Sequence, residues 1–402
     1  MIDIKDKIKQ LAQEYYNDVI AIRRHLHQNP ELSFEETQTA QYIISLLKKA
    51  QVKYTAGIAN NGIVAFIEGK NPSKKTIALR ADIDALPIEE KNSVDYKSKN
   101  KGVMHACGHD AHTASIMGCL YILNKLKNEF EGTIKIIFQP AEEKLPGGAK
   151  LMIQEGVLEN PKPDLIIGQH VFPDLPTGTV GFRSGVYMAS TDEIYLTVKG
   201  KGGHAATPEK ITQTVFVAAE IISQLKEIQK QAPKEIKTIL SIGKVIANGA
   251  TNIVPSEVYM EGTFRTMDEN WRKKVHQKIK DTASEIATKN GAQIEVNIID
   301  GYPVLVNNSE ITEKAISFAQ DFLGSEKVQE LPLRMTAEDF AYYSQEIPAT
   351  FYRLGTTKKG TEYIPLHSPY FDIDEESLKI GMGTMAYIAM NFMIHTNTKD
   401  TN

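Results

Sequence analysis

The sequence predicts an α/β fold: a mostly parallel sheet with helices on both faces, interrupted by an inserted ferredoxin-like α+β domain. Three observations lead to this prediction. Short apolar runs alternate with helical patterns over residues 1–183, a β-α-β-β-α-β order occupies residues 184–300, and helical and strand patterns alternate again over residues 301–402. We therefore expect a discontinuous main domain, formed by residues 1–183 and 301–402, around an insertion of residues 184–300.

The first part of the main domain contains alternating helices and strands. Apolar residues at helical spacing from Ile4 to Leu26 predict a helix that ends before Asn29-Pro30, because the residue before a proline disfavours the helical conformation. A second helix is expected over residues 35–49. Strands are then expected over residues 63–68, 76–80, 133–138 and 164–168, and helices over residues 110–127 and near residue 149. Ligands of parallel sheets bind beyond the carboxyl ends of the strands, which is where we expect the site.

The inserted domain and the end of the chain follow the same kind of pattern. In the insertion we expect strands over residues 192–198, 237–245, 257–265 and 293–299, and helices over residues 212–230 and 269–289. After the insertion we expect helices over residues 310–322 and 337–344, a strand over residues 350–354 and a buried last helix that includes residues 380–394.

Composition narrows the classes of partner. The 402 residues carry 46 Lys+Arg and 50 Asp+Glu, a net charge of −4, which favours neither a nucleic acid nor an anionic membrane as the partner. No run of 18 apolar residues occurs. The two cysteines, Cys107 and Cys119, are too few for a disulfide framework and compatible with a reducing compartment, so we expect a cytoplasmic protein.

One short segment concentrates potential metal ligands. His105, Cys107, His109 and His112 fall within Met104-His-Ala-Cys-Gly-His-Asp-Ala-His, and imidazole and thiolate are the donors that zinc-like metals prefer. Gly108 lets the backbone bend between the Cys107 and His109 donors. The dipole of the helix that follows is expected to lower the pKa of Cys107. A histidine-rich loop with a buried cysteine is the alternative.

Further donors follow neighbouring strands. Glu142 and Glu143 come after the strand that ends at Phe138, and His170 ends the next strand. His367 lies in a loop framed by prolines. Adjacent acids alone are typical of a solvated turn, and an isolated loop histidine is typical of a structural role. Together with Cys107 and His109, these side chains suffice for two metal ions about 3.5–4 Å apart, with one of the two glutamates left as a general base.

The chain resembles a known family. The runs HACGHDAHT, AEE after a strand, GGHAATPE, NIVPSEVYMEGTFRT, MTAEDFAYY and LHSPYF resemble the dinuclear-metal amidohydrolases of the aminoacylase and carboxypeptidase superfamily, in the branch of hippurate hydrolase, N-acetyldiaminopimelate deacetylase and auxin–amino acid conjugate hydrolase. The resemblance covers essentially the whole chain. It implies that two divalent metal ions are held by Cys107, His109, Glu143, His170 and His367. The thiolate ligand favours zinc, whereas carboxylate and imidazole ligands also suit manganese, cobalt or nickel.

The resemblance also implies roles for further residues. Glu142 is expected to be the general base, and His204 of the inserted domain is expected to stabilise the oxyanion. The inserted domain is expected to act as a lid and to form a homodimer, so that His204 and Asn252 complete the partner's site. Arg265 and a backbone group of Gly355 are candidates for contacts with the substrate.

The early strand departs from the pattern of the peptidase-type members of the family. Peptidase-type members have a His-x-Asp pair where this chain reads Arg80-Ala-Asp82-Ile-Asp84. We expect Asp84 to orient a metal-binding histidine, with a structural, salt-bridged aspartate as the alternative. His105 and His112 are left outside the ligand set because five donors suffice. Glu338 and Asp339 are expected to support the site.

The function expected is metal-dependent hydrolysis of the amide bond of an N-acyl-L-amino acid, with an acetyl or aromatic acyl group, to a carboxylate and a free amino acid. A metallo-carboxypeptidase or dipeptidase acting on peptides is the nearest alternative. A cysteine hydrolase with Cys107 as nucleophile and a non-enzymatic metal-binding module are further alternatives.

Overall fold

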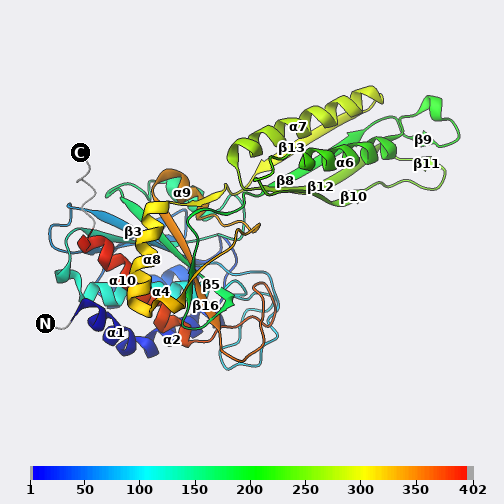
Figure 1. The fold of residues 1–402 in the computed structure, drawn as a ribbon. Helices are drawn as coiled ribbons and strands as arrows, with labels where there is room; N and C mark the ends of the chain where they lie inside the picture. Colours follow the sequence, from blue (N-terminus) through cyan, green and yellow to red (C-terminus); the bar gives the residue numbers. More distant parts are fainter. Residues whose placement is uncertain (1–2, 396–402) are drawn as a thin grey trace, which may run out of the picture. The chain divides into compact units, whose positions relative to one another are not determined.

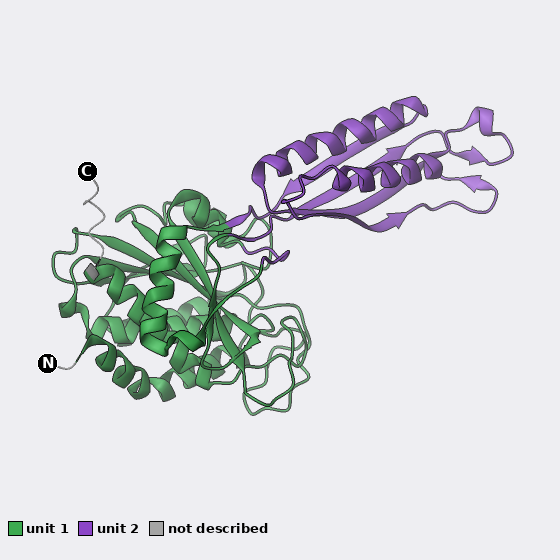
Figure 2. Cartoon of the chain, in the orientation of Figure 1, with its two compact units in different colours: residues 1–185, 306–332, 339–402 green, residues 186–305, 333–338 purple. Residues whose placement is uncertain are grey.

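The computed structural model describes residues 3–395 and divides the chain into two compact units (Figure 2). Unit 1 comprises residues up to Gly185, Val306–Pro332 and the chain from Asp339 on, and unit 2 comprises Val186–Leu305 and Leu333–Glu338. The sequence predicted a single insertion over residues 184–300, without the short second segment. In the described part of the chain, no helix is both long enough and apolar enough to cross a membrane.

Unit 1 contains an eight-stranded sheet in the order β1-β2-β4-β3-β5-β16-β6-β15. The four central strands, β4, β3, β5 and β16, are parallel to one another, whereas β1 with β2, β2 with β4, and β16 with β6 are antiparallel. The expectation of a mostly parallel sheet is therefore confirmed for its centre. The bounds of the strands are β1 Lys53–Ile58, β2 Gly62–Glu68, β3 Thr76–Asp82, β4 Thr133–Gln139, β5 Leu165–Pro176, β6 Val180–Phe182, β15 Val328–Glu330 and β16 Ala349–Thr357.

Helices cover both faces of this sheet. Strand β3 shows why: Ile77, Leu79 and Ala81 belong to the core under α4 and α10, and the alternate residue Arg80 contacts Asp339, close to α9, on the other face. Figure 1 shows α4, α8 and α10 beside β5 and β16. The bounds of the helices are α1 Ile4–Glu14, α2 Tyr16–Gln28, α3 Thr37–Lys49, α4 His109–Lys125, α5 Gly148–Gln154, α8 Ser309–Leu323, α9 Ala341–Glu346 and α10 Glu376–His395, with 3-10 turns η1 Lys127–Glu129 and η3 Ser325–Lys327.

Unit 2 has the predicted ferredoxin-like topology. Its antiparallel sheet has the order β10-β12-β8-β13, and α6 and α7 pack on an apolar core that includes Leu196, Ile221 and Ile279. The bounds of the elements are β8 Asp192–Lys199, α6 Thr214–Lys230, β10 Thr238–Ile246, β12 Glu257–Thr266, α7 Glu269–Lys289 and β13 Gln293–Asp300, with the short elements β9 Gly203–His204, η2 Pro208–Lys210 and β11 Ile253–Val254; β7 Gly185–Met188 and β14 Leu305–Asn307 form a further pair.

The structure corrects several expected boundaries. The long first helix is interrupted at Tyr15, which separates α1 from α2. Strand β1 was missed because it is an exposed antiparallel strand without an apolar run. The helix expected over residues 337–344 begins only at Ala341. Strand β5 continues to Pro176, so His170 lies inside the strand and not at its end.

Candidate metal centre

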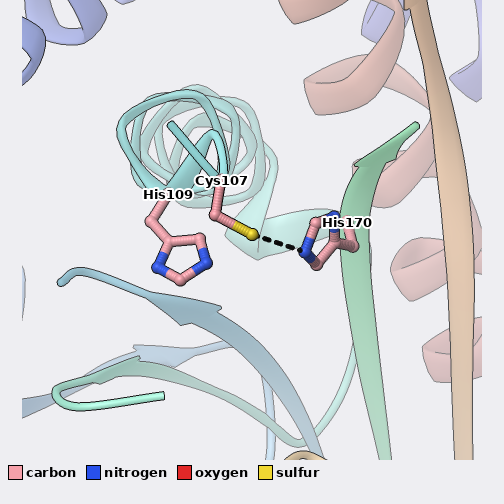
Figure 3. A group of neighbouring side chains, drawn as sticks. All are labelled: Cys107, His109 and His170. Atoms are coloured by element: carbon pink, nitrogen blue, oxygen red, sulfur yellow. Dashed lines mark hydrogen bonds between the residues drawn. The ribbon is translucent and has the colours of Figure 1, made fainter. Parts of the chain in front are cut away.

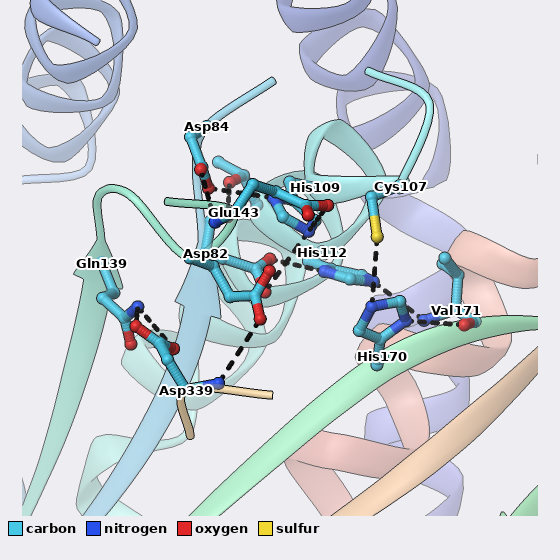
Figure 4. Close-up of polar contacts among 12 residues, drawn as sticks. Asp82, Asp84, Cys107, His109, His112, Gln139, Glu143, His170, Val171 and Asp339 are labelled. Carbon is cyan, nitrogen blue, oxygen red and sulfur yellow. Dashed lines mark hydrogen bonds and ion pairs between the residues drawn. The ribbon is translucent and has the colours of Figure 1, made fainter. Parts of the chain in front are cut away.

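Segments from four parts of unit 1 meet at the carboxyl ends of β3 and β4. They are the end of β3 with the residues after it, the turn that begins α4, the turn after β4, and the part of β5 that extends past its pairing with β3 (Figure 4). Strands β4, β3 and β5 are neighbours in the sheet and parallel, so the segments that follow them are brought to one edge. The chain thus folds its histidine-rich turn against its adjacent glutamates.

The first donor group is formed by Cys107, His109 and His170. Their ligand atoms lie within 4.8 Å of one another, all three side chains are buried, and Cys107 Sγ lies 3.5 Å from His170 Nε2 (Figure 3). Gly108 makes this turn possible because it adopts φ +81°, and a Cβ there would lie 2.5 Å from Val171 Cγ2. The expected closeness of the Cys107 and His109 donors is present.

The second donor group is formed by Cys107, Glu143 and His367. Their ligand atoms also lie within 4.8 Å of one another, and Glu143 Oε1 is 3.3 Å from His367 Nε2. The peptide N–H of His367 donates to the carbonyl of Ala106 over 2.8 Å, which ties the late loop to the turn before Cys107. His367 is half-exposed, so this side of the group is the one open to solvent.

Asp84 determines which nitrogen of His109 faces the group. Its Oδ1 is 3.1 Å from His109 Nδ1, and its Oδ2 accepts hydrogen bonds from Ser33 Oγ and from the peptide N–H of Glu143. The Nδ1 proton is thereby held by a carboxylate, so Nε2 is the nitrogen that can give its lone pair to a cation that replaces the second ring proton. Nε2 lies 3.9 Å from Glu143 Oε1.

The electrostatic field at His109 favours a cation. Burial by itself lowers the pKa of His109, but the Asp82, Asp84 and Glu143 carboxylates raise it to about 10. A site that holds a proton so firmly is suited to a divalent ion in its place. Two atoms that face this region, His109 Nε2 and Glu143 Oε1, are buried and make no hydrogen bond. The donor set and these atoms fit a metal site.

His112 is excluded as a ligand by its own hydrogen bonds. Its Nε2 accepts the peptide N–H of Val171 over 2.8 Å, and its Nδ1 lies 2.5 Å from Asp82 Oδ1. Both nitrogens are therefore used, and His112 instead holds the backbone next to His170. His170 Nδ1 donates to the Val171 carbonyl, so its Nε2 lone pair faces Cys107. Burial and the charge of Arg353 keep the pKa of His170 far below its usual value.

The expected pKa of Cys107 is wrong in direction. Burial raises the pKa of the thiol well above its usual value, and the Glu143 and Glu142 carboxylates raise it further. These effects exceed that of the α4 dipole. A thiol in this environment is a poor nucleophile on its own, and it needs a bound cation to become a thiolate.

A buried polar network supports the glutamate turn. Glu142 lies in a third donor group with His109 and Glu143, is 7% exposed, and its Oε1 accepts the peptide N–H of Asp339 over 3.4 Å. Asp339 also accepts hydrogen bonds from Arg80 and Gln139. Asp339 thus contacts Glu142, Arg80 and Gln139, and its supporting role stays a prediction.

The remaining expected contact residues are described within their own units. His204 and Asn252 belong to the paired β9–β11 segments of unit 2, where the peptide N–H of Ala205 donates to the Asn252 carbonyl. Arg265, also in unit 2, donates from Nη1 to the Met335 carbonyl over 3.1 Å. The N–H of Gly355 in unit 1 donates to the Thr179 carbonyl, so it is not available to a substrate.

The sequence interpretation missed three polar residues around the centre. Asp82 holds His112 and lies 3.7 Å from His109 Nε2, while Ser33 and Glu36 contact Asp84 and the glutamate turn. Asp82 belongs to the Arg-Ala-Asp-Ile-Asp run directly after the strand predicted over residues 76–80. That position could have indicated a residue of the site. His105 is buried with both ring nitrogens lacking a hydrogen bond, and burial lowers its pKa to about 4.

Histidine, cysteine and carboxylate side chains that could hold metal ions are clustered at the edge of a parallel sheet in this α/β protein. Residues 78–391 match the family described as "Peptidase family M20/M25/M40", and the chain belongs to this family of hydrolases.

Relatives match over nearly the whole length. Thermostable carboxypeptidase 2 of Saccharolobus solfataricus is 38% identical over 397 residues, covering 97% of this chain and 99% of the relative. N-acetylcysteine deacetylase of Bacillus subtilis is 38% identical over 380 residues, covering 94% and 97%. A solved Bacillus subtilis structure, described as a dinuclear metal binding peptidase from the M20 family, has a TM-score of 0.81 at 36% identity and covers 95% of this chain and 99% of that one.

Proposed function

We propose that this protein hydrolyses the amide bond of N-acyl-L-amino acids, with two divalent metal ions, to a carboxylate and a free amino acid. The observation that carries the proposal is the gathering of Cys107, His109, Glu143, His170 and His367 donor atoms in two groups that share Cys107. The deacetylase activity in the name of one relative and the dinuclear centre in the description of another support it.

The proposed ligands fit the chemistry of a metal pair. Cys107, His109 and His170 would hold one ion, and Glu143 and His367 would hold the second with Cys107 close to both. When bound, the ions make water more acidic and polarise the acyl carbonyl. The Cys107 thiolate favours zinc as the native metal, whereas imidazole and carboxylate also suit manganese, cobalt or nickel.

Glu142 is the proposed general base. Its carboxylate lies within 4.8 Å of the donor atoms of His109 and Glu143, and the Asp339 N–H holds one of its oxygens. Because it is not needed as a ligand, Glu142 can accept the proton of the attacking water and deliver it to the leaving amine nitrogen. Asp84 keeps His109 in the tautomer whose Nε2 lone pair faces the ion.

Unit 2 is proposed to supply the oxyanion donor and to form a homodimer. His204 would donate to the developing oxyanion, with Asn252 beside it, and Arg265 would bind the carboxylate of the substrate. The dimer surface is supported by exposed apolar residues on the edge strand β10 and on α6: Val245 is 51% exposed and Phe216 is 72% exposed. In such a dimer, His204 and Asn252 serve the partner's site.

The structure and the relatives bear differently on the alternative activities. A carboxypeptidase or dipeptidase would use the same residues, and the name of one relative supports that alternative. A cysteine hydrolase is disfavoured because burial and two glutamates raise the pKa of Cys107.

We also propose a cytoplasmic location, supported by the two cysteines, which are both free and buried.

The test is the release of free amino acid from a panel of N-acetyl, N-benzoyl and dipeptide substrates. Each substrate is assayed with the protein as purified, after chelation, and after zinc or manganese is restored. We expect acylated amino acids to be cleaved faster than dipeptides, with activity lost on chelation and regained with metal. Faster cleavage of dipeptides would replace the proposal with the peptidase alternative, and activity that survives complete metal removal would refute the two-metal mechanism.

A further inference from the structure

The loop that joins α2 to α3 buries two polar side chains. Ser33 is 8% exposed and Glu36 is fully buried, whereas the adjacent Glu35 is exposed. Polar side chains on a connecting loop normally remain in water, and burying a carboxylate is unfavourable unless hydrogen bonds compensate it. Glu36 therefore needs specific partners inside the fold.

Glu36 finds one of those partners in the turn after β4, 105 residues along the chain. Its Oε1 accepts the peptide N–H of Ala141 over 2.8 Å and that of Phe34 over 3.0 Å. Its Oε2 accepts a hydrogen bond from Asn61 Nδ2 over 3.0 Å. Three donors thus surround the carboxylate, and one of them belongs to the residue directly before Glu142.

The conformation of Ala141 explains why its N–H needs an anchor. Ala141 has φ +52°, in the left-handed region that disfavours any residue with a Cβ. Its carbonyl accepts the peptide N–H of Gly148, which closes the turn from the other side. This unfavourable conformation sets the direction in which the chain leaves β4 and presents Glu142 and Glu143.

The same loop is linked to the other end of this turn through Asp84. Ser33 Oγ donates to Asp84 Oδ2 over 2.7 Å, and that oxygen accepts the peptide N–H of Glu143 over 3.0 Å. The two peptide N–H groups that flank Glu142, those of Ala141 and Glu143, are therefore each held by a buried carboxylate. Glu36 holds the first and Asp84 holds the second.

We propose that Glu36 is a positioning residue for the base of the reaction: through the Ala141 N–H it fixes the turn that aims the Glu142 carboxylate at the substrate. The inference rests on the proposed function, because it gives Glu142 the role of base. Glu36 is not one of the proposed metal ligands, and its carboxylate is occupied by three protein donors. Asp84 holds Glu143 separately, so loss of Glu36 misplaces Glu142 while the metal ligands stay in place.

Four variants of the full-length protein test the proposal. Glu36→Ala removes the acceptor, Glu36→Gln keeps an amide oxygen that can accept the Ala141 N–H, and Glu35→Ala removes the exposed neighbouring carboxylate as a control. Asn61→Ala loosens Glu36 without removing it and serves if Glu36→Ala does not fold. For each variant we measure kcat and KM on the best N-acyl substrate, metal content, and hydrogen exchange in peptides that cover residues 139–148.

For Glu36→Ala we expect kcat to fall about 10- to 100-fold, with KM within about twofold and the metal content of the wild type, because a small misplacement of a reacting group costs that much. Glu36→Gln should stay within about threefold of the wild type, Asn61→Ala should lose about 3- to 10-fold in kcat, and Glu35→Ala should not change. Exchange in residues 139–148 should accelerate in Glu36→Ala and Asn61→Ala only.

A further substitution tests whether the left-handed conformation of Ala141 is the reason why loss of Glu36 lowers kcat. Glycine adopts positive φ without a Cβ penalty, so Ala141→Gly should restore part of the kcat of Glu36→Ala. The proposal is overturned if Glu36→Ala keeps full kcat, if Gln fails as badly as Ala, or if activity falls only in proportion to metal loss. A wild type that cleaves no N-acyl substrate would refute the proposed function instead, and hydrogen exchange would still decide whether Glu36 holds the turn.

Discussion

Replacing Asp84 with asparagine should weaken the metal centre without removing any proposed ligand. Asp84 accepts three hydrogen bonds: Oδ1 from His109 Nδ1, and Oδ2 from Ser33 Oγ and the Glu143 N–H. Asparagine offers a single oxygen and an NH₂ group of nearly the same shape. Whichever way the amide is turned, its NH₂ must face either His109 Nδ1 or the Glu143 N–H.

Each orientation has a definite cost. If the NH₂ faces Glu143, a buried peptide N–H loses its acceptor, which costs about 1–3 kcal/mol. If it faces His109, the imidazole is driven toward the tautomer that carries its proton on Nε2, and the lone pair meant for the metal is lost. Changes of this kind behind a ligand typically reduce metal affinity or activity about 10- to 100-fold, or about 1.4–2.7 kcal/mol.

The assay is a competition titration of the apo-protein and a chromophoric chelator for zinc, followed by kcat/KM measured at saturating metal. Asp95→Asn is the matched control, because it makes the same chemical change at an exposed aspartate of unit 1. An Asp84→Asn protein with metal affinity and kcat/KM within twofold of the wild type would refute the role assigned to Asp84.

Four further predictions concern the base, a buried lysine, the pH dependence of that lysine's contribution, and the dimer. Glu142→Ala should retain both metals while kcat falls at least about 10²-fold, measured by metal analysis and turnover; loss of metal would instead make Glu142 a ligand. Lys135 Nζ donates hydrogen bonds to the carbonyls of Val157, Glu159 and Pro161. Lys135→Met leaves these buried acceptors without a donor, so it should lower the free energy of unfolding by about 2–4 kcal/mol in urea titrations. A loss under about 1 kcal/mol would contradict this expectation. Burial lowers the pKa of Lys135 from its ordinary value of 10.5 to about 8, so between about pH 8 and pH 10.5 the unfolded chain binds one proton more than the folded chain. The difference in the free energy of unfolding between the wild type and Lys135→Met should therefore increase as pH rises through that range. A constant or decreasing difference would exclude the lowered pKa. Phe216→Ser should shift the dimer toward monomer in sedimentation at micromolar protein, whereas a wild type that is monomeric there would end the dimer proposal.

Much of the fold could be predicted because repeating patterns in the sequence are local. The alternation of strands and helices, the β-α-β-β-α-β order of unit 2 and most element bounds follow from side-chain periods of 2 and 3.6 residues. Where that local signal is weak, the prediction failed: β1 is an exposed strand with no apolar run, and the interruption at Tyr15 falls within a continuous helical pattern.

The location of the candidate site could also be predicted in outline. Glu142 and Glu143 follow strand β4, Cys107 lies between β3 and the helix α4 that connects it to β4, and parallel strands bring their carboxyl ends to one edge. The closeness of these residues therefore follows from element order alone. Their roles as ligand and base remain predictions that the metal and kinetic measurements above will decide.

Only the tertiary structure decided what each polar atom faces. Four potential ligands lie within eight residues, yet His112 has both nitrogens occupied by Asp82 and Val171, while His109 keeps Nε2 without a hydrogen bond. The raised pKa of Cys107 and the buried contacts of Glu36 depend on neighbours far away in the chain. Side-chain periodicity is a local property and can be read in sequence; a tautomer, a pKa or a hydrogen-bond partner is set by whichever groups folding places within a few ångströms, and those come from distant segments.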